Sequence, residues 1–496
     1  MISADGSKLI VVGPTMRGKV TAANFGGTNI TAIARGGFSH NLKITSVTLP
    51  NVTTLGAYAF GFYDESKPDE RSSLTTVNLG KLTEIGEYAF YGILINEMPN
   101  FDADTVVGIY AFAKSGIAEV TIPDGMSIPE GMFAECHNLE TVTIGNNVAI
   151  GDMAFFTNRN YNLHVKQWQE EDGKTYAEYV FDSAIKKITI GDNVVIGKSA
   201  FQNAAAVTTV TLGENAKIGD QAFYNCSSLK NIDLSKAESI GAYAFSGDSY
   251  YICTDNSMET PASKNYRYLI QYTACALTDV DLSSAKSIGG YAFATCRNLV
   301  SVKLSDEIVE LPEYVFYGCI ALNDINMDKL ETIGELAFYE SALESADLPN
   351  VTKIGSYAFL YNKGLTSVIL NSNGTIIENG AFANCVALKE VQNMQFVTEI
   401  QANAFAYTSL TEVDLTSVVK LGTGAFAKHL YLCEACGERS SDKDDECGNI
   451  ECRAKDSKVV DILTLTVKLG TALTEFGDNP FAYCKIAPFS NFGSMR

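Results

Sequence analysis

The stretch Ile240-Gly241-Ala242-Tyr243-Ala244-Phe245 decides the fold, because close variants of it return along almost the whole chain. It reappears as Ile85-Gly86-Glu87-Tyr88-Ala89-Phe90, as Ile288-Gly289-Gly290-Tyr291-Ala292-Phe293 and as Ile354-Gly355-Ser356-Tyr357-Ala358-Phe359. The closing phenylalanine recurs, mostly in steps of 20 to 23 residues, at positions 38, 60, 90, 112, 133, 155, 181, 201, 223, 245, 293, 316, 338, 359, 382, 405, 426 and 481. Self-similarity at a short fixed period is typical of a solenoid, in which each repeat forms one turn.

Between successive phenylalanines the pattern predicts two short strands. In Leu229-Lys230-Asn231-Ile232-Asp233-Leu234, apolar residues alternate with polar ones, which is the period of a half-buried strand. A second apolar segment, Ser239-Ile240, follows before the Ala-Phe pair. A repeat of about 22 residues is too short for a strand, a full helix and two loops. We therefore expect two extended pieces and at most one helical turn per repeat, with parallel strands stacked from turn to turn.

Stacking of the turns should bring the recurring phenylalanines into one buried spine. A single turn cannot bury its own apolar face, so the stability of a solenoid comes from neighbouring turns. Glycine stands four residues before the phenylalanine in most repeats, for example Gly86 and Gly334, but Pro129 and Pro312 occupy the same position. Because proline fixes φ at about −65°, we expect negative φ here, with glycine chosen for space.

The phrases Ile-Gly-x-Tyr-Ala-Phe-x-x-Cys and Leu-x-x-Val-x-Leu strongly resemble the BspA-type leucine-rich repeats, and the resemblance covers residues 20 to 485. It implies a right-handed leucine-rich repeat solenoid of the α/β repeat class, with mostly short parallel strands and loops and little helix. We expect about 17–18 turns from the recurring phenylalanines. The family is found on surface and secreted proteins of host-associated bacteria and some parasitic protists. Its members are linked to adhesion, matrix-protein binding and contact with other microbes, and it brings no catalytic residues.

The repeat organises the chain as one solenoid domain. We expect an N-terminal cap at 1–20, a single BspA-type solenoid over 21–485 and a C-terminal tail at 486–496. Steps longer than the period indicate insertions, which lie near 61–71, 156–180, 246–272 and 427–458. Insertions in solenoids are loops on one face, often the recognition face, although neutral drift in a tolerant loop explains them as well. Residues 156–180, which carry the only tryptophan, Trp168, fit either a degenerate turn or an insertion.

Most of the twelve cysteines follow the repeat. Those that lie three residues after the repeat phenylalanine are Cys136, Cys226, Cys296, Cys319, Cys385 and Cys484, and Cys275 lies in nearly the same phase. Ser115, Ser341 and Thr408 fill the position in other turns, so the position does not require a reactive thiol. We expect buried free thiols there, although consecutive turns bring Cys296 and Cys319 within conceivable reach of a disulfide.

Four further cysteines, Cys433, Cys436, Cys447 and Cys452, lie off the repeat phase inside one insertion. The first two have the spacing of a zinc-binding pair, and the four-residue gap of the second pair is within the range for ligands. A structural zinc site with four thiolates and one or two disulfides are both open interpretations, and export from the cell favours disulfides. His429 is a spare zinc candidate. We expect no other cofactor.

Composition and charge exclude several functions. The chain has 58 acidic and 37 basic residues and a net charge of −21, which argues against nucleic acid and anionic membrane as partners. No run of 18 apolar residues indicates a membrane span, so we expect no membrane insertion. The first residues lack the pattern of a secretion signal. The protein is therefore either intracellular or the mature segment of an exported one, and the family resemblance favours the cell surface or secretion.

Residue chemistry points away from catalysis. Only four histidines occur, at 40, 137, 164 and 429, and none stands in a recognisable arrangement with a nucleophile and a carboxylate. No phosphate-binding glycine loop is present, so we expect no enzyme. Candidate binding residues on the polar strand face are Asp233, Asp281, Asp347 and Asp414. A cation could bridge such carboxylates if they lay close together, but solvated carboxylates need no metal.

Tyrosines two residues before the phenylalanine, such as Tyr58, Tyr88 and Tyr291, offer a second possible surface. They fit a stacking platform for a glycan or protein, or half-buried packing with a solvated hydroxyl. The combined hypothesis is a monomeric, non-enzymatic interaction protein of the cell surface or secreted space. It would bind an unidentified protein or glycan through the solenoid surface and the inserted loops. The alternative is a structural stalk or spacer that presents another domain and binds no ligand.

Overall fold

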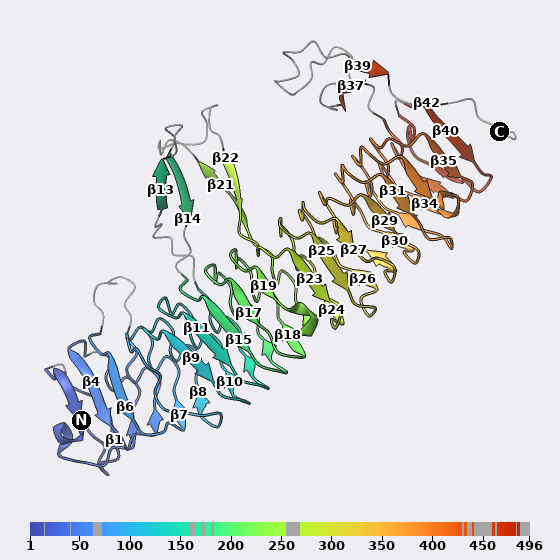
Figure 1. Cartoon of the computed structure of the whole chain (residues 1–496). Coiled ribbons are helices and arrows are strands. Elements are labelled where there is room, and N and C mark those ends of the chain that lie inside the picture. The colour runs from blue at the N-terminus through green and yellow to red at the C-terminus, as the bar shows by residue number, and fades with distance from the viewer. Residues whose placement is uncertain are drawn as a thin grey trace. The chain divides into compact units, whose positions relative to one another are not determined.

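A computed structural model describes residues 1–13, 15–39, 41–62, 72–157, 165–169, 175–179, 183–253, 268–428, 431–433, 439–440, 459–461, 464–482 and 484–486. The chain divides into two compact units, Met1–Leu277 and Thr278–Arg496. In Figure 1 the first unit runs from blue to green and the second from yellow-green to red. Each unit is a stack of backbone turns, and the two strands of a turn belong to two different faces of the stack.

The first face is made by the strands with the Leu-x-x-Val-x-Leu pattern. In the first unit these are β2 (Gly18–Thr21), β4 (Ile44–Leu49), β6 (Thr76–Leu79), β9 (Glu119–Ile122), β11 (Thr141–Ile144), β15 (Lys187–Ile190), β17 (Thr209–Thr211) and β19 (Asn231–Ile232). In the second unit they are β23 (Asp279–Leu282), β25 (Ser301–Leu304), β27 (Asp324–Ile325), β29 (Ser345–Asp347), β31 (Ser367–Ile369), β33 (Glu390–Gln392), β35 (Glu412–Leu415), β40 (Thr464–Leu469) and β42 (Lys485–Ile486).

The second face is made by the shorter strands that precede the Ala-Phe pair. In the first unit these are β1 (Lys8–Leu9), β3 (Ala32–Ile33), β5 (Thr54–Leu55), β7 (Glu84–Ile85), β8 (Val106–Val107), β10 (Ser127–Ile128), β12 (Ala149–Ile150), β16 (Val195–Ile196), β18 (Ala216–Ile218) and β20 (Ala237–Ile240). In the second unit they are β24 (Ser287–Ile288), β26 (Glu310–Leu311), β28 (Thr332–Ile333), β30 (Lys353–Ile354), β32 (Ile376–Ile377), β34 (Glu399–Ile400), β36 (Lys420–Leu421) and β41 (Glu475–Phe476).

The described residues contain no α-helix, and their helical segments are the short 3-10 helices η1 (Ala22–Phe25), η2 (Leu234–Lys236) and η3 (Met394–Phe396). Antiparallel strands occur only within the insertions of the described chain, apart from an isolated bridge at the N-terminus. They form the hairpins β13 (Val165–Gln169) with β14 (Thr175–Tyr179) and β21 (Ser249–Cys253) with β22 (Tyr268–Tyr272), and the group β37 (Tyr431–Cys433), β38 (Arg439–Ser440) and β39 (Val459–Asp461).

Register between turns follows the sequence repeat. Val142 of β11 pairs with Ile188 of β15, which pairs with Val210 of β17, and all three side chains are buried. The residues on either side of each, such as Thr143 and Thr189, lie on the opposite surface because side chains alternate along a strand. The alternation read from the sequence therefore separates an apolar interior from a polar exterior in every turn.

The repeat phenylalanines form the predicted spine. Neighbouring rings stack with centroids 4.9 to 5.6 Å apart in the first unit, from Phe38 to Phe245. The same spacing is 5.0 to 5.8 Å in the second unit, from Phe293 to Phe481. This distance matches the roughly 4.8 Å between parallel strands, so the rings repeat with the backbone. The expected solenoid of short parallel strands is confirmed.

The sequence count of turns included position 181 as a spine phenylalanine, and the stack leaves no place for it. Phe155 stacks directly on Phe201 with centroids 4.9 Å apart, and β11 pairs directly with β15. No turn can lie between these two rings, so residues 156–182 interrupt the stack as an insertion. An aromatic residue at the right spacing cannot reveal by itself whether its turn joins the stack.

The glycine four residues before the phenylalanine is confirmed as a spatial requirement. A Cβ on Gly86 would lie 2.5 Å from the backbone nitrogen of Ala57, and one on Gly334 would lie 2.6 Å from that of Glu313. Neither glycine has positive φ. The left-handed conformation falls instead two residues before the phenylalanine, where Tyr88 has φ 55°. A non-glycine residue there costs about 1–2 kcal/mol, and packing of the tyrosine ring offsets that cost.

Candidate functional site

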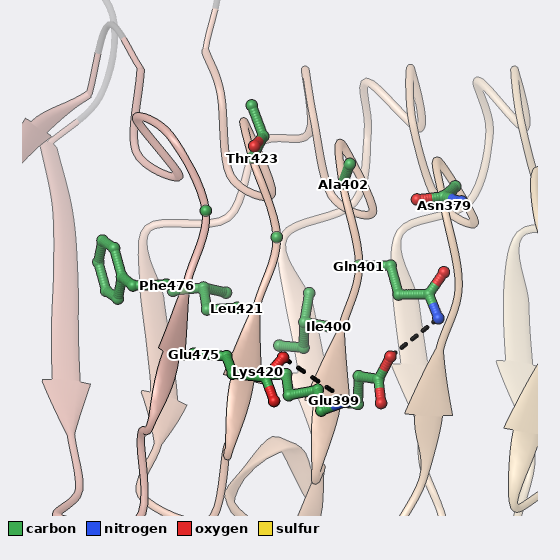
Figure 2. A pocket seen from close by; sticks show the side chains of 12 residues that line it. Asn379, Glu399, Ile400, Gln401, Ala402, Lys420, Leu421, Thr423, Glu475 and Phe476 are labelled. Atoms are coloured by element: carbon green, nitrogen blue, oxygen red, sulfur yellow. Dashed lines mark hydrogen bonds and ion pairs between the residues drawn. The ribbon is translucent and has the colours of Figure 1, made fainter.

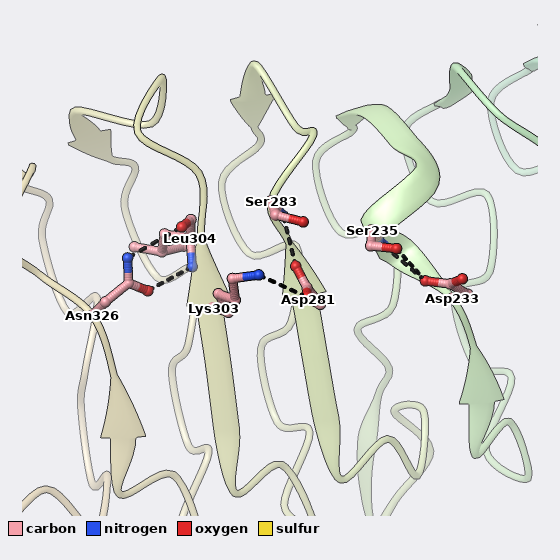
Figure 3. Close-up of polar contacts among 7 residues, drawn as sticks. All are labelled: Asp233, Ser235, Asp281, Ser283, Lys303, Leu304 and Asn326. Atoms are coloured by element: carbon pink, nitrogen blue, oxygen red, sulfur yellow. Dashed lines mark hydrogen bonds and ion pairs between the residues drawn. The ribbon is translucent and has the colours of Figure 1, made fainter.

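The four candidate aspartates lie on first-face strands or directly after one, and most of them stabilise the turn that follows. Asp233 Oδ1 accepts hydrogen bonds from the backbone nitrogen (3.2 Å) and hydroxyl (2.5 Å) of Ser235, which caps η2. In the second unit, Asp281 Oδ1 accepts from the backbone nitrogen of Ser283 at 2.8 Å. Figure 3 shows both contacts. Short side chains of this kind favour turns because they replace a missing backbone partner.

Two of the aspartates also pair with a lysine on the next strand. Asp281 accepts from Lys303 Nζ at 3.2 Å, as Figure 3 shows, and Asp414 accepts from Lys468 Nζ at 2.6 Å. Burial opposes ionisation of both carboxyls, but these lysines and the hydrogen bonds from the following turn hold the pKa of each below its usual value. Both carboxylates are therefore charged and already neutralised by a neighbour.

The structure does not bring the second-unit aspartates together. Asp281, Asp347 and Asp414 belong to three different sheets, on β23, β29 and β35. Their neighbours on the next strand are Lys303, Ile369 and Lys468, in that order. No carboxylate faces another across these strand pairs, so the geometry that a bridging cation requires is absent from them. The described residues hold no cluster of three metal-binding side chains.

The tyrosine ladder is packed face to face. In the first unit Tyr88 stacks between Tyr58 and Tyr110, with ring centroids 4.9 and 5.3 Å apart and nearly parallel planes. Arg35 lies 5.6 Å from the centroid of Tyr58, and a Cβ on Gly131 would lie 2.2 Å from the ring of Tyr110. Desolvation raises the pKa of Tyr110 to about 12. Because neighbours cover the ring faces, this ladder fits half-buried packing rather than a platform on which a sugar could stack.

The cysteines of the repeat phase are free thiols, as expected, and six of the seven are buried. Several of these thiols donate a hydrogen bond to the carbonyl of the repeat phenylalanine one turn earlier. Cys319 donates to Phe293 at 3.1 Å, and Cys385 donates to Phe359 at 3.1 Å. Asn362 makes the same contact to Phe338 at 2.6 Å. Cysteine and asparagine thus act as small donors between turns, whereas Thr408 at the same position donates to Phe405 of its own repeat. Burial raises the pKa of the Cys136 thiol to about 11.

The off-phase cysteines cannot be assigned a geometry. Cys433 ends β37, and its side chain lies outside the described part of the chain. Cys436, Cys447, Cys452 and His429 also lie outside the described residues. The choice between structural zinc and disulfides stays a prediction.

A shallow groove of about 460 Å³ lies over β34, β36 and β41 in the second unit, and sequence reasoning missed it. Figure 2 shows its side chains. Asn379, Ala402 and Thr423 line it and stand three residues before their phenylalanines. Earlier turns of this unit carry glycine, glutamate or serine at that position, so the sequence offers no signal for the groove.

Charged and aromatic groups edge the groove. Lys420 Nζ lies 3.6 Å from Glu475 Oε2, and Gln401 donates to Glu399 at 2.9 Å. The side chain of Phe476 is 57% exposed. The groove is wide open, and Figure 2 marks these two contacts with dashed lines. It can accept a protruding side chain or sugar ring, but it does not enclose a substrate as an active site does.

The repeated turns of the backbone define the class of protein to which the chain belongs. Parallel strands on two faces, an aromatic spine and one backbone turn per repeat are the features of a leucine-rich-type solenoid. Residues 31–163, 171–260, 268–385 and 322–433 match the family model described as BspA type leucine rich repeat region. The chain belongs to the BspA-type leucine-rich repeat family.

Solved structures of bacterial proteins resemble it at low sequence identity. A leucine-rich repeat protein from Bacteroides ovatus has a TM-score of 0.44 and 18% identity, with 84% of this chain and 88% of that chain covered. A leucine rich cell surface protein from Faecalibacterium prausnitzii has a TM-score of 0.30 and 21% identity over 79% and 92%. The pneumococcal vaccine antigen PcpA has a TM-score of 0.29 and 14% identity over 83% and 87%. No curated protein matches the chain significantly.

Within the part of the chain that the structure describes, no helix is long and apolar enough to span a bilayer.

Proposed function

We propose that this chain is a non-enzymatic binding protein of the cell surface or the secreted space, and that its role is adhesion to a host or microbial macromolecule. Membership of the BspA-type family supports a role in binding. The candidate aspartates also support it. They accept hydrogen bonds from the following turn or from a lysine, and they do not gather in a reactive cluster.

The in-register exterior of the first face carries the proposal. Thr121, Thr143, Thr189 and Thr211 occupy matching positions on β9, β11, β15 and β17. A second row on the same strands runs through Glu119, Thr141, Lys187 and Thr209. These residues are exposed or half-exposed. Rows of short polar groups at the strand spacing give a broad surface without a pocket, which suits an extended macromolecule better than a small substrate.

Direct binding measurements test the proposal. The purified chain would be presented to immobilised matrix proteins, purified glycans and commensal cell walls, with binding followed by biolayer interferometry. We expect binding to at least one of these at a Kd of about 10 µM or tighter. The double substitution Thr143→Arg with Thr189→Arg should weaken it at least about tenfold, because two guanidinium groups would stand in the polar rows.

A matched control uses the second face of the same turns. Ala149 and Val195 pair in register on β12 and β16 and are both exposed. Ala149→Arg with Val195→Arg adds the same charge to the other side of the stack and should leave binding within about twofold. A chain that binds none of the three probe classes would instead be the stalk or spacer. Protease treatment of intact source cells, with immunodetection of the chain, tests the location, and a chain inaccessible inside the cell would contradict it.

A further inference from the structure

The second-face sheet of the first unit begins with a strand whose outer edge is closed. Strand β1 pairs with β3 on one side, and on the other side Leu9 forms an antiparallel bridge with Ile2. The backbone nitrogen of Ser3 donates to the carbonyl of Lys8 at 2.8 Å, and Leu9 is fully buried. An open sheet edge is a template on which a further strand can form, but residues at the N-terminus already occupy this one.

The corresponding sheet of the second unit ends with an open edge. Its last strand, β41, pairs with β36 and with no other strand of the described chain. The backbone nitrogen of Glu475 donates to the carbonyl of Val419 at 3.1 Å. The nitrogen of Gly477 donates to the carbonyl of Leu421 at 2.7 Å. These two nitrogens bind the turn before, and no described strand lies against the other side of β41.

Two carbonyls on that other side lack the partner that their equivalents have. In each earlier turn of the sheet, the carbonyl of the apolar strand residue accepts a hydrogen bond of 2.7 to 3.0 Å from the following turn, as it does at Leu311, Ile333, Ile354, Ile377, Ile400 and Leu421. Phe476 takes the place of Leu421 in register, and Thr474 takes that of Val419. No described residue donates to the carbonyl of Phe476 or of Thr474.

An apolar side chain is uncovered at the same point. Phe476 is 57% exposed, whereas the six equivalent residues of the earlier turns are at most 2% exposed. Figure 2 shows the end of this row, where Ile400 and Leu421 are followed by the ring of Phe476. Because each turn of a solenoid is covered by its neighbour, an added strand with an aliphatic residue opposite Phe476 would cover the ring.

Charge on the outward row of the same strands specifies the neighbouring position. Glu399, Lys420 and Glu475 follow one another in register and alternate in sign. Lys420 Nζ lies 3.6 Å from Glu475 Oε2, and the side chain of Glu475 is still 64% exposed. Asp478, just after the strand, is exposed as well. A basic residue opposite Glu475 continues the alternation, whereas an acidic residue there is repelled.

The position after the strand has little space. A Cβ on Gly477 would lie 2.3 Å from the backbone nitrogen of Thr423, one turn earlier. Glycine is therefore favoured at the same position of an added strand, although Gln401 shows that another residue is tolerated. The edge thus selects a basic residue, an aliphatic residue and glycine, in that order. Residues 420–422 of the chain itself have this order and pair with β34.

We propose that the open edge of β41 is a docking site for an extended segment of another polypeptide, in which a basic residue, an aliphatic residue and glycine pair in parallel with Glu475, Phe476 and Gly477. The nitrogens of the basic residue and the glycine donate to the carbonyls of Thr474 and Phe476, which lie about 6.6 Å apart along the strand. In strand addition of this kind, main-chain hydrogen bonds supply affinity and alternate side chains supply specificity. The site lies on the second face and goes beyond the proposed adhesion through the first.

Two other occupants fit the edge less well. A second copy of the chain carries the required order on β18, β30 and β36, but each of these strands is already paired on both sides. Its strand β1 is closed by Ile2. A glycan does not offer the N–H donors at alternate positions of an extended backbone that the two carbonyls require.

Synthetic peptides test the pairing directly. The probe is a fluorescein-labelled peptide with the sequence of residues 416–424, TSVVKLGTG, titrated with the full chain and followed by fluorescence polarisation. We expect a Kd of about 100 µM or tighter. Methylation of the peptide nitrogen at the first glycine should weaken binding at least about tenfold, because that nitrogen donates to Phe476. Methylation at the leucine nitrogen, which points away from β41, is the matched control and should change binding by less than about twofold.

Charge reversal on the protein tests the side-chain contact. Glu475→Lys should weaken binding of the peptide at least about fivefold and should favour a peptide in which glutamate replaces the lysine. Glu310→Lys, the same change at an exposed position of the same row on β26, should leave binding within about twofold. Phe476→Ala should weaken binding at least about threefold, because the aliphatic residue loses its contact. Thermal unfolding followed by circular dichroism checks that each variant retains the solenoid.

The outcomes separate this site from its alternatives. Binding that is lost on glycine methylation alone, with an exchanged charge preference in Glu475→Lys, would support the site. Equal binding of the two methylated peptides would overturn strand addition. A chain ended after Ile486 that binds the peptide at least about tenfold more tightly would show that the chain itself occupies the edge, and would also overturn the site. Self-association in light scattering that Glu475→Lys abolishes would assign the edge to a second copy. A chain that binds none of the peptides would overturn the site and leave first-face adhesion to its own test.

Discussion

At the scale of single residues, the structure changes the meaning of the polar positions. Asp281 and Asp414 look like ligand-binding carboxylates in the sequence, but each caps the turn after its strand and pairs with a lysine. The number of repeat cysteines suggests reactive thiols, yet six of the seven donate a hydrogen bond to a carbonyl of the turn before. The alternation of polar and apolar residues correctly places such side chains as the aspartates on the exterior of the stack. It does not identify the residue with which each one forms a hydrogen bond or ion pair.

The aspartate–lysine pair predicts a pH dependence of stability. The folded state holds the pKa of Asp414 below its unfolded value of about 3.9. The resulting stabilisation is present above that pH and is lost as pH falls through the lower folded value. Asp414→Asn should therefore lower the free energy of unfolding by at most about 1 kcal/mol at pH 7, since the pair is partly exposed. Chemical denaturation should show this difference disappear as pH falls through the lowered folded-state pKa of Asp414.

Asp347→Asn is the control for that substitution, because Asp347 ends a first-face strand opposite Ile369 rather than a lysine. Its effect on stability should be smaller at pH 7. A larger loss for Asp347→Asn than for Asp414→Asn would contradict the role given to the lysine pair.

Buried thiols predict low reactivity. Burial raises the pKa of Cys226 and Cys385 well above its ordinary value, and the thiolate is the reactive form. Iodoacetamide at pH 8 should leave both unlabelled in the native protein and label both after unfolding, as read by peptide mass spectrometry. Cys484, which is less buried, should react before them, although its pKa is raised to about 11. Rapid native labelling of Cys226 would contradict its buried position.

At the scale of elements, the distance between turns explains the glycine pattern. A backbone spacing near 4.8 Å leaves no room for a Cβ at bends such as those of Gly86 and Gly334, which follow second-face strands. The left-handed bend two residues before the phenylalanine is a separate requirement, and tyrosine, asparagine and glycine meet it in different turns. The two requirements can be separated by substitution.

Two glycine-to-alanine changes in the second unit should differ sharply. Gly334 has negative φ, but its Cβ would lie 2.6 Å from backbone, so Gly334→Ala should cost about 3 kcal/mol or more by forcing turns apart. Gly318 lies at a second left-handed position, two residues after Phe316, with φ 68° and a nearest Cβ contact of 3.7 Å, so Gly318→Ala should cost only about 1–2 kcal/mol from strain. Urea denaturation measures both. The reverse order would mean that conformation, not space, selects glycine before the phenylalanine.

At the scale of the whole molecule, stability is shared between neighbouring turns. Phe223 is fully buried between Phe201 and Phe245, at 5.4 and 5.5 Å. Phe223→Ala should lower the free energy of unfolding by about 3–5 kcal/mol, because it removes a ring from the middle of a spine. Phe38→Ala should lower the free energy of unfolding by less, because Phe38 begins the stack. Thermal or urea unfolding checks both, and a loss below about 1 kcal/mol at Phe223 would contradict the spine.

Much of the architecture was predictable from the sequence, because a solenoid repeats one local solution. The alternation in Leu-x-x-Val-x-Leu set the strands, the recurring phenylalanine set the spine, and Pro129 beside the glycines showed that their φ is negative. These features depend on residues close in the chain and on an identical neighbour above and below. A single sequence that repeats its own pattern carries that information.

Tertiary structure alone decided how the irregular parts fit. Position 181 had the spacing of a spine phenylalanine, yet the ring of Phe155 stacks directly on that of Phe201. This arrangement pairs strand β11 with β15 and keeps the row of stacked rings continuous. The groove over β34, β36 and β41 depends on short side chains from three turns lying together. Asn225 bonds both to Asn203 of the turn before and to Asp248 of an insertion. Such contacts connect parts of the chain with no common pattern, so only the folded backbone could reveal them.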